Sequence, residues 1–449
     1  MKKLIAIWAA KLLSVIGKII GKKSSSTPGE VALKICPDII RILSKSVEKG
    51  IIVTCGTNGK TTTNNLLNTA LIKGGYVTVC NNIGANMIGG IATAFAQSCD
   101  FKGNLKADFA VLEIDEAAAR RAFEHFTPNY MIITNLFRDQ LDRYGEIDTT
   151  ISLLDDAVKM AKGVKLILNG DDPLTAQFGI GKDSKYFGIS EQVLPQTDET
   201  NEGRFCSKCG EEQSYNYRHY NQLGDYYCPH CGNKRPKIDF SAHDVDLSSS
   251  MKFTVNDTPI DVNYRGFYNI YNILAVYSAL NVIGTDTKNF NQMLSDYKPQ
   301  IGRMELIDLG KPFILNLAKN PAGFNQAIQT VMLDKRKKDV IIAVNDCASD
   351  GKDVSWLWDV DFDSLKNANM NTLTVGGSRL YDLALRFKYS GIDVDHVTKN
   401  IKSALQSCMS TDSEVCYVLV NYTVLFSTQT TMLELQKNAN NKLEVRDND

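Results

Sequence analysis

The segment that most constrains the fold is residues 51–75, IIVTCGTNGKTTTNNLLNTALIKGG. An apolar run typical of a buried strand leads into a glycine-containing turn, and a helix-forming run follows the turn. The backbone N–H groups of such a turn and the helix dipole both favour a bound phosphate. An ordinary strand-to-helix turn is the alternative, but Lys60 and Thr61 supply the side chains that bind outer phosphates and Mg²⁺. The sequence therefore predicts a nucleotide site formed by Gly56, Thr57, Asn58, Gly59, Lys60, Thr61 and Thr62.

Strand-like runs recur after this segment at YVTVC, DFAVLEI, YMIITNL and VKLILNG, with helix-compatible segments between them. This alternation predicts an α/β domain with a mostly parallel sheet covered by helices. From about residue 310 the pattern starts again with KPFILNL, KDVIIAV, NTLTVGG and VCYVLVNY, which predicts a second α/β domain. The 449 residues are enough for two or three domains. We expect an N-terminal segment over 1–45, a central nucleotide-binding domain over 46–308 and a C-terminal domain over 309–449.

The N-terminal segment has apolar residues at three- and four-residue spacing, with lysines among them. The apolar residues are Ile5, Trp8, Ala9, Leu12, Leu13, Ile16, Ile19 and Ile20, and the lysines are Lys2, Lys3, Lys11, Lys18, Lys22 and Lys23. Because Lys11 interrupts the apolar run and no clean cleavage site follows, a signal peptide is disfavoured. The pattern fits a basic amphipathic helix on an anionic membrane surface. It fits equally a terminal helix packed on the protein's own core, because periodicity does not separate the two.

Four of the eleven cysteines form two C-x-x-C pairs inside a polar insert over 204–236. Cys206 and Cys209 are separated from Cys228 and Cys231 by 18 residues, which is the spacing of a zinc ribbon. Four thiolates leave no open position on the metal, so the predicted role is structural. A redox dithiol is the alternative, but two pairs at this distance argue against it. We expect His219 and His230 to lie on the surface of the insert.

Polar and acidic residues follow several predicted strands. Glu113 follows DFAVL and can hold a metal through its carboxylate, and the next strand is followed by Asn135, Asp139, Gln140 and Asp142. In an open parallel sheet, ligands bind at the edge where the strands end. The formal net charge of −1, in contrast, gives no electrostatic case for nucleic-acid binding.

Several motifs resemble those of the Mur ligase superfamily, which includes the peptidoglycan peptide ligases and folylpolyglutamate synthase. In chain order they are GTNGKT, LEIDE, TNLFRDQLDRYG, LILNGDDP, GFYNIYNILAV and GRME. This resemblance implies that Lys60 and Thr61 serve the ATP phosphates and Mg²⁺, and that Glu113 serves the metal. It also implies that Asn269 and Asn272 lie near the adenine and that Arg303 meets the phosphates.

The chain departs from the peptide ligases in the half that would accept an amino acid. About 45 residues precede the nucleotide loop, too few for a domain that binds a UDP-linked substrate. Gln140 replaces the histidine of the D-H-L-D motif, and residues 316–321 (NLAKNP) lack the aspartate and histidine of D-Y-A-H-N-P. No lysine stands where the carbamylated lysine of those ligases is expected.

The zinc-ribbon spacing, the segment DGKDVSWLWD at 350–359 and TPGEVALKI near the start together resemble the MurT family. In that family the Mur-like chain pairs, as a heterodimer, with GatD, a class I glutamine amidotransferase that carries the nucleophilic cysteine and its histidine. The resemblance implies that an aspartate of this chain completes the partner's triad. Asp353 matches its place, and Asp350 is the second choice.

The implied reaction is the ATP-dependent amidation of the D-glutamate α-carboxylate in lipid II, by ammonia from the partner, at the cytoplasmic face of the membrane. A stand-alone ligase of the Mur or folylpolyglutamate type, which adds an amino acid, is the alternative enzyme. A nucleotide-binding scaffold that only assembles partners is the alternative from a different class.

Overall fold

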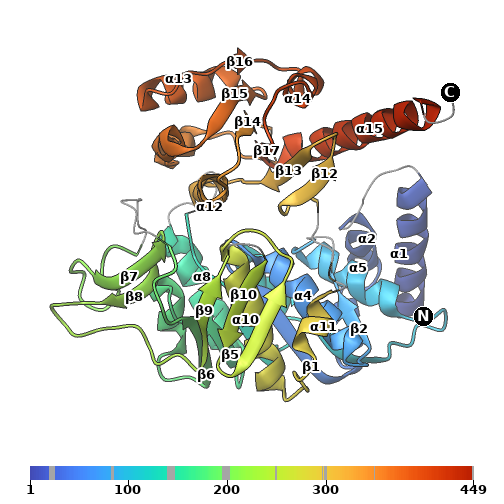
Figure 1. Ribbon diagram of the computed structural model, residues 1–449. Helices are drawn as coiled ribbons and strands as arrows, with labels where there is room; N and C mark the ends of the chain where they lie inside the picture. Colours follow the sequence, from blue (N-terminus) through green and yellow to red (C-terminus); the bar gives the residue numbers. More distant parts are fainter. Residues whose placement is uncertain are drawn as a thin grey trace. The chain divides into compact units, whose positions relative to one another are not determined.

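The computed structural model describes residues 1–19, 26–81, 85–138, 147–194, 203–247, 250–295, 297, 301–347 and 349–446, with side chains as far as residue 439. The chain divides into two compact units (Figure 1). Unit 1 comprises Met1–Phe137, Glu146–Tyr264 and Tyr268–Tyr297. Unit 2 comprises Arg138–Gly145, Arg265–Phe267 and Lys298–Asp449. The domain limits at residues 45 and 308 remain a prediction. In the division into compact units, the longest segment of unit 2 is Lys298–Asp449.

Unit 1 is built on one large sheet with the strand order β11-β10-β9-β6-β5-β4-β1-β3-β2 among the described residues. The strands are β1 (Val47–Cys55), β2 (Thr78–Cys80), β3 (Ala107–Glu113), β4 (Tyr130–Ile133), β5 (Lys165–Asn169), β6 (Ser184–Ile189), β9 (Phe240–Asp246), β10 (Met251–Val255) and β11 (Thr258–Val262). Strands β1 to β6 and β9 pair in parallel, whereas β9, β10 and β11 pair antiparallel. The predicted α/β domain with a mostly parallel sheet is confirmed.

The helices of unit 1 pack on this sheet or, as α1 and α2 do, on other helices (Figure 1). They are α1 (Lys2–Ile19), α2 (Thr27–Ile35), α3 (Ile39–Ser44), α4 (Lys60–Lys73), α5 (Ile88–Ser98), α6 (Glu116–Phe123), α8 (Ile147–Met160), α9 (Pro173–Ala176), the 3₁₀ turn η1 (Gln177–Gly179), α10 (Tyr268–Ile283) and α11 (Phe290–Ser295). Strand β1 is central and fully buried from Gly50 to Cys55, because helices cover both faces of a parallel sheet. Because β1 pairs in parallel with β3 and β4, its carboxyl end lies beside the carboxyl ends of these two strands, and the nucleotide loop begins there.

Helix α1 packs against α2 and α5 through Ala6, Ile7 and Ala10, none of which is exposed to solvent. The prediction of a terminal helix packed on the protein's own core is therefore correct for this face of α1. Among the residues described, no helix has the length and apolar character needed to span a bilayer.

The cysteine insert forms its own two-stranded antiparallel sheet, β7 (Ser214–Tyr220) with β8 (Leu223–Tyr227). We call this pair the ribbon hairpin. The two C-x-x-C pairs lie at its open end, because Cys209 precedes β7 and Cys228 follows β8 directly.

Unit 2 is a second α/β domain, as predicted, with the sheet order β12-β13-β17-β14-β15-β16. Its strands are β12 (Glu305–Asp308), β13 (Pro312–Leu317), β14 (Lys338–Ala343), β15 (Met370–Gly376), β16 (His396–Val397) and β17 (Val415–Val420). All pairs are parallel except β12 with β13. The helices are α12 (Pro321–Leu333), α13 (Leu380–Ser390), α14 (Ile401–Met409) and α15 (Tyr422–Arg446), with 3₁₀ turns η2 (Ser355–Asp359) and η3 (Phe362–Asn367).

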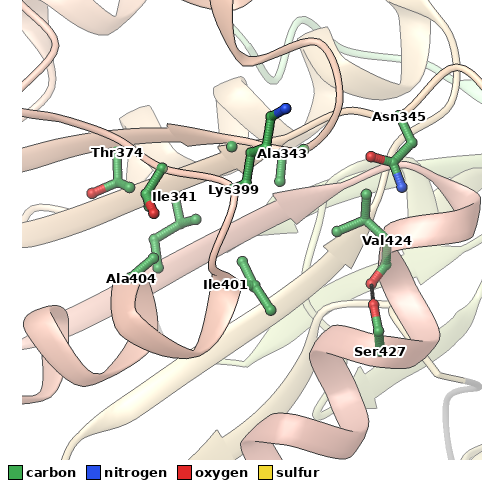
Figure 2. Close-up of a pocket in the computed structure, with 12 residues that line it drawn as sticks. Ile341, Ala343, Asn345, Thr374, Lys399, Ile401, Ala404, Val424 and Ser427 are labelled. Atoms are coloured by element: carbon green, nitrogen blue, oxygen red, sulfur yellow. Dashed lines mark hydrogen bonds between the residues drawn. The ribbon is translucent and has the colours of Figure 1, made fainter.

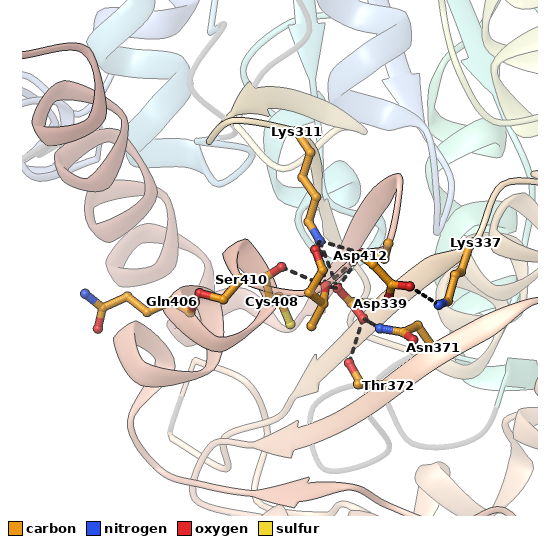
Figure 3. Close-up of polar contacts among 11 residues, drawn as sticks. Lys311, Lys337, Asp339, Asn371, Thr372, Gln406, Cys408, Ser410 and Asp412 are labelled. Atoms are coloured by element: carbon orange, nitrogen blue, oxygen red, sulfur yellow. Dashed lines mark hydrogen bonds and ion pairs between the residues drawn. The ribbon is translucent and has the colours of Figure 1, made fainter. Parts of the chain in front are cut away.

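A buried carboxylate, Asp339, ties together the edge of this sheet at which β14 and β15 begin (Figure 3). It accepts hydrogen bonds from Asn371 Nδ2 (3.0 Å) and Thr372 Oγ1 (2.8 Å), and Lys311 Nζ lies 3.2 Å away. Burial alone raises the pKa of Asp339, but its hydrogen bonds from Ser413 and the other neighbours hold it below its ordinary value. The cluster lies at the amino ends of the strands, away from the edge where ligands bind, so we assign it a structural role.

Candidate nucleotide and metal sites

The nucleotide loop connects the end of β1 to the start of α4 through two glycines with positive φ. Gly56 has a φ of 118° and Gly59 has a φ of 83°. A Cβ atom at Gly56 would lie 2.3 Å from Thr134 Oγ1, and one at Gly59 would lie 2.2 Å from Asn272 Oδ1. Both positions therefore exclude a side chain by backbone conformation and by space. This local geometry confirms the predicted strand, glycine loop and helix.

Residues that follow β4 hold the loop from one side. Thr57 N donates to Asn135 O (2.8 Å), and Asn58 N donates to Asn135 Oδ1 (2.9 Å). Thr134 Oγ1 in turn donates to Asn58 O at 2.7 Å. The prediction that Asn135 lies at the same sheet edge as the loop is confirmed, while Asp139, Gln140 and Asp142 lie outside the described residues.

The Lys60 ammonium is folded onto its own loop. It donates to Gly56 O and Thr57 O, and it forms an ion pair of 3.0 Å with Glu116 Oε1. Glu116 also accepts a hydrogen bond of 2.7 Å from Gly56 N. Burial alone lowers the pKa of Lys60, but the carboxylates of Glu116, Asp115 and Glu113 raise it above its ordinary value. Lys60 is therefore a cation held beside the loop backbone.

Glu116 is the principal site residue that the sequence interpretation missed. It stands in the quoted motif LEIDE, three positions after Glu113, and it begins α6. Because one of its oxygens contacts both the loop backbone and Lys60, it fixes the position of the lysine relative to the glycine turn. The signal that could have found it is a second carboxylate within the same motif.

Glu113 ends β3 directly beside the loop, since it pairs with Thr54 of β1 in the sheet register. Its side chain is buried, and its backbone is fixed by Asn81, which accepts from Glu113 N (2.8 Å) and donates to Glu113 O (2.7 Å). Asn86 Nδ2 lies 3.4 Å from Glu113 Oε1. The carboxylate of Glu113 and the hydroxyl of Thr61, at the start of α4, are the hard oxygen ligands that Mg²⁺ prefers, so this donor set fits the metal.

Asn272 connects α10 to α4, the helix that follows the loop. Its Oδ1 accepts from Thr63 Oγ1 at 3.3 Å, and its Nδ2 donates to Asn269 Oδ1 at 2.9 Å. The structure thus brings both asparagines beside α4, within the same unit as the loop. Arg303 belongs to unit 2, where it lies half-buried in the turn before β12.

The four cysteines of the ribbon come together as predicted, with their Sγ atoms all within 4.8 Å of one another. Cys206 and Cys231 are 3.6 Å apart, and Cys209 and Cys228 are 3.5 Å apart. A tetrahedral Zn²⁺ with Zn–S bonds of about 2.3 Å requires sulfur separations of about 3.8 Å, so the donor set fits zinc. Gly210 and Gly232, with φ of 77° and 71°, form the tight turns after each pair.

One prediction for the ribbon is wrong. His219 is 1% exposed, because its ring packs against α10 of the same unit, where the centroid of the Tyr271 ring lies 6.3 Å away. Burial, and then the neighbouring charge of Arg235, lowers the pKa of His219 to about 3, so the ring is neutral. His230 is exposed, as predicted. The error arose because the sequence shows where a hairpin forms but not which face it buries.

The two candidate aspartates of unit 2 differ in accessibility. Asp350 is buried, and its two carboxylate oxygens accept from Thr423 N (2.9 Å) and from Thr423 Oγ1 at the start of α15. Asp353 is half-buried, and its Oδ1 accepts from Ser355 N (2.8 Å) at the start of η2. Hydrogen bonds from Ser355 lower the pKa of Asp353 below its ordinary value, so the group is ionised at neutral pH.

Unit 2 also contains a small pocket between the sheet and helices α14 and α15 (Figure 2). Its volume is about 120 Å³, and its walls include Ile341, Ile401, Ala404 and Val424, with Lys399 and Asn345 among the polar lining residues. Ligand pockets of small molecules usually measure about 300–1,000 Å³, so this pocket is too small for a nucleotide or a peptide. It does not compete with the loop as the candidate site.

Two family models match the chain. Residues 53–280 match the Mur ligase middle domain, and residues 317–425 match the MurT ligase C-terminal domain. The first match includes the nucleotide loop and the zinc ribbon, and the second includes Asp350 and Asp353.

Curated relatives match nearly the whole chain. The lipid II isoglutaminyl synthase (glutamine-hydrolyzing) subunit MurT of Staphylococcus aureus (strain COL) is 36% identical over 397 residues, which is 88% of this chain and 89% of the relative. The subunit of the same name from Streptococcus pneumoniae is 34% identical over 411 residues, which is 90% and 91% of the two chains.

Solved structures show the same fold at lower identity. A pseudomurein peptide ligase type C from Methanothermus fervidus superimposes with a TM-score of 0.70 at 24% identity, over 92% of this chain and 85% of its own. The MurF ligase of Thermotoga maritima in complex with ADP gives a TM-score of 0.65 at 12% identity, over 92% and 85%.

Proposed function

The chain belongs to the MurT family of Mur-ligase-like proteins, and we propose that it is the ATP-using subunit that amidates lipid II. The observation that carries this proposal is the match of residues 317–425 to the MurT ligase C-terminal domain, which distinguishes this family from the ligases that add an amino acid. Its curated relatives are glutamine-hydrolysing ligase subunits, and the word subunit implies a second chain. We propose that this second chain is a GatD-like class I glutamine amidotransferase and that the two form a heterodimer.

The chemistry assigned to the loop is the activation of a carboxylate. A carboxylate is a poor electrophile, and transfer of the ATP γ-phosphoryl group to the D-glutamate α-carboxylate makes an acyl phosphate. Ammonia attacks the carbonyl carbon, the amide C–N bond forms, and inorganic phosphate leaves. Lys60 would stabilise the charge that moves through the phosphoryl group, together with Arg303 of unit 2.

We assign the binding of Mg²⁺ and of the adenine ring to residues around the loop. Thr61 and Glu113 would hold Mg²⁺, which supplies charge neutralisation at the phosphates. Asn269 and Asn272, beside α4, would lie near the adenine. Zinc held by Cys206, Cys209, Cys228 and Cys231 would have a structural role.

Asn320 caps α12 by accepting a hydrogen bond from Gly323 N (2.8 Å). The segment NLAKNP therefore keeps its helix start, although it lacks the aspartate and histidine of D-Y-A-H-N-P.

Ammonia would come from glutamine hydrolysed by the partner. Asp353 is half-buried whereas Asp350 is buried and holds Thr423 with both oxygens, so we assign to Asp353 the role of orienting a partner's histidine. With a lipid-borne substrate, the complex would work at the membrane, and we propose its cytoplasmic face.

The test is to express the chain with its glutaminase partner and to measure the mass of purified lipid II after incubation with ATP and glutamine. We expect a decrease of about 1 Da, because NH₂ replaces OH. Omission of ATP or of glutamine should abolish the change. A mass increase that depends on an added amino acid, without glutaminase, would support the stand-alone ligase instead.

A further inference from the structure

The outer face of α1 carries an unbroken apolar stripe. Its members are Ile5, Trp8, Leu12, Val15, Ile16 and Ile19, which are between 40% and 79% exposed. At 100° per residue they fall within about 100° of the helix circumference, opposite the buried Ala6, Ile7 and Ala10. Exposed apolar residues scattered singly need no explanation, but a contiguous stripe of this length marks an interaction surface.

Hydrogen bonds fix α1 on α5, and Phe101, in the loop after α5, extends the apolar surface of the stripe. Lys11 Nζ donates to Gln97 O (2.9 Å), and Gln97 Nε2 donates to Ser14 Oγ (2.7 Å), which fixes α1 on α5. Trp8 Nε1 donates to Phe101 O (3.1 Å). Phe101 is itself 76% exposed and packs edge-on against Trp8 at 6.2 Å, so a second aromatic ring continues the apolar surface.

The charged side chains of α1 itself are all positive. Helix α1 contains Lys2, Lys3, Lys11 and Lys18 and no acidic residue, although the whole chain has a formal net charge of −1. An apolar stripe with aromatic rings and flanking lysines is complementary to an anionic lipid surface, where rings enter the interface and ammonium groups meet phosphates. We propose that the outer face of α1 seats the protein on an anionic membrane. The inference deepens the proposed function, because it names the surface that brings the enzyme to a lipid-borne substrate.

Vesicle sedimentation of the full chain with its glutaminase partner tests this proposal. The probes are vesicles of equal parts phosphatidylglycerol and phosphatidylcholine, and vesicles of phosphatidylcholine alone. We expect the wild-type complex to bind the anionic vesicles, and the double variant Leu12→Glu, Ile16→Glu to bind them at least tenfold more weakly. Ile180→Glu is the matched control, since Ile180 is 76% exposed on the loop after η1, and it should bind as the wild type does.

The proposal is overturned if the double variant and Ile180→Glu bind the anionic vesicles equally, or if neutral vesicles bind the wild type as well as anionic ones do. Loss of the glutaminase partner from the double variant with vesicle binding unchanged would show that the stripe is a protein interface. The assay contains no ATP, glutamine or lipid II, so its outcome is separate from that of the amidation experiment.

A second inference rests on different contacts, those of the ribbon hairpin. One end of the hairpin is anchored by the cysteines, and an isolated two-stranded hairpin is marginally stable without such anchoring. At the other end, Gln222 is fully buried, and its Nε2 donates to Leu136 O (2.5 Å) and to Asp172 Oδ1 (3.3 Å). Tyr220 packs against Phe137 with 6.0 Å between ring centroids.

The segment that the hairpin contacts is the one that holds the nucleotide loop. Phe137 N donates to Thr57 Oγ1 (3.0 Å), and Thr57 Oγ1 donates to Phe137 O (3.1 Å). The contacts therefore run from Gln222 through Leu136 and Phe137 to Thr57. We infer that the zinc ribbon positions the nucleotide loop, and that Gln222 is the positioning residue that connects them. This inference assumes the proposed nucleotide role of the loop.

The test compares Gln222→Ala with Gln213→Ala in the zinc-loaded protein. Gln213 is a buried glutamine before β7 whose Nε2 donates to Gly203 O (2.7 Å) rather than to Leu136. We expect the dissociation constant for MgATP, measured by calorimetry, to rise on the order of tenfold for Gln222→Ala and to change little for Gln213→Ala. Zinc content and melting temperature should be similar in the two variants. If Gln222→Ala does not fold, Tyr220→Leu, which removes the ring contact with Phe137, takes its place.

Equal MgATP affinity in the two variants, with wild-type binding intact, would overturn the inference. Failure of the wild type to bind MgATP would instead contradict the proposed function, so the two failures are distinguishable.

Discussion

Replacement of Lys60 by methionine is expected to lower the rate of ATP-dependent lipid II amidation about a thousandfold. Methionine keeps an unbranched apolar chain in the buried position but removes the ammonium group, and loss of one preorganised charge at a phosphoryl-transfer site costs about 10²- to 10³-fold or more. Lys60 is suited to this role because the carboxylates around it keep it protonated. The measurements are the initial rate of ADP release and the mass of lipid II, in the complex with the glutaminase.

The same substitution leaves Glu116 buried without its cation, and an uncompensated buried charge destabilises a fold by about 3–5 kcal/mol. The double variant Lys60→Met, Glu116→Gln separates the two effects, because it should recover the melting temperature and remain inactive. Lys73→Met, at the exposed end of α4, is the matched control and should keep full activity. A double variant that melts as the wild type does and amidates within tenfold of its rate would show that Lys60 is dispensable.

The strand, glycine loop and helix of the candidate nucleotide site could be predicted from sequence because their signals are local. A buried strand, two glycines and a lysine within ten residues determine the loop, and parallel strands bring Glu113 and Asn135 to the same edge. Glu116 was missed because its contact with Gly56 N depends on how the start of α6 approaches β1, which no periodicity encodes.

For a similar reason, the sequence could not predict which face of an amphipathic helix or strand is buried. Periodicity identified the apolar stripe of α1 except for Val15. It did not show that the smaller side chains of the opposite face, Ala6 and Ala10 with Ile7, make the packing contact. The C-x-x-C spacing identified the cysteine knuckles but not that β7 would bury His219 against α10. In both cases the buried face is determined by how well two surfaces that are distant in the sequence pack together.

Asp353→Asn is expected to abolish glutamine-dependent amidation while sparing amidation driven by added ammonium chloride. In a hydrolase triad the acid orients the histidine, and loss of its charge costs about 10⁴-fold in rate. Ammonium chloride bypasses the glutaminase, so the ATP site of unit 1 should work at the wild-type rate. The two rates, measured on the same preparation, give a ratio that a general loss of folding does not change.

Asp350→Asn provides the contrast. Asp350 fixes the start of α15 through Thr423, and loss of such a helix-capping carboxylate costs about 0.5–2 kcal/mol of stability. This variant should therefore melt at a lower temperature and should lose glutamine- and ammonia-dependent activity in equal proportion. If Asp350→Asn instead loses only the glutamine-dependent rate, and Asp353→Asn keeps it, the partner's histidine is oriented by Asp350. If both variants keep glutamine-dependent amidation, neither aspartate serves the glutaminase. Had either one oriented the partner's histidine, its replacement by asparagine would have lowered that rate.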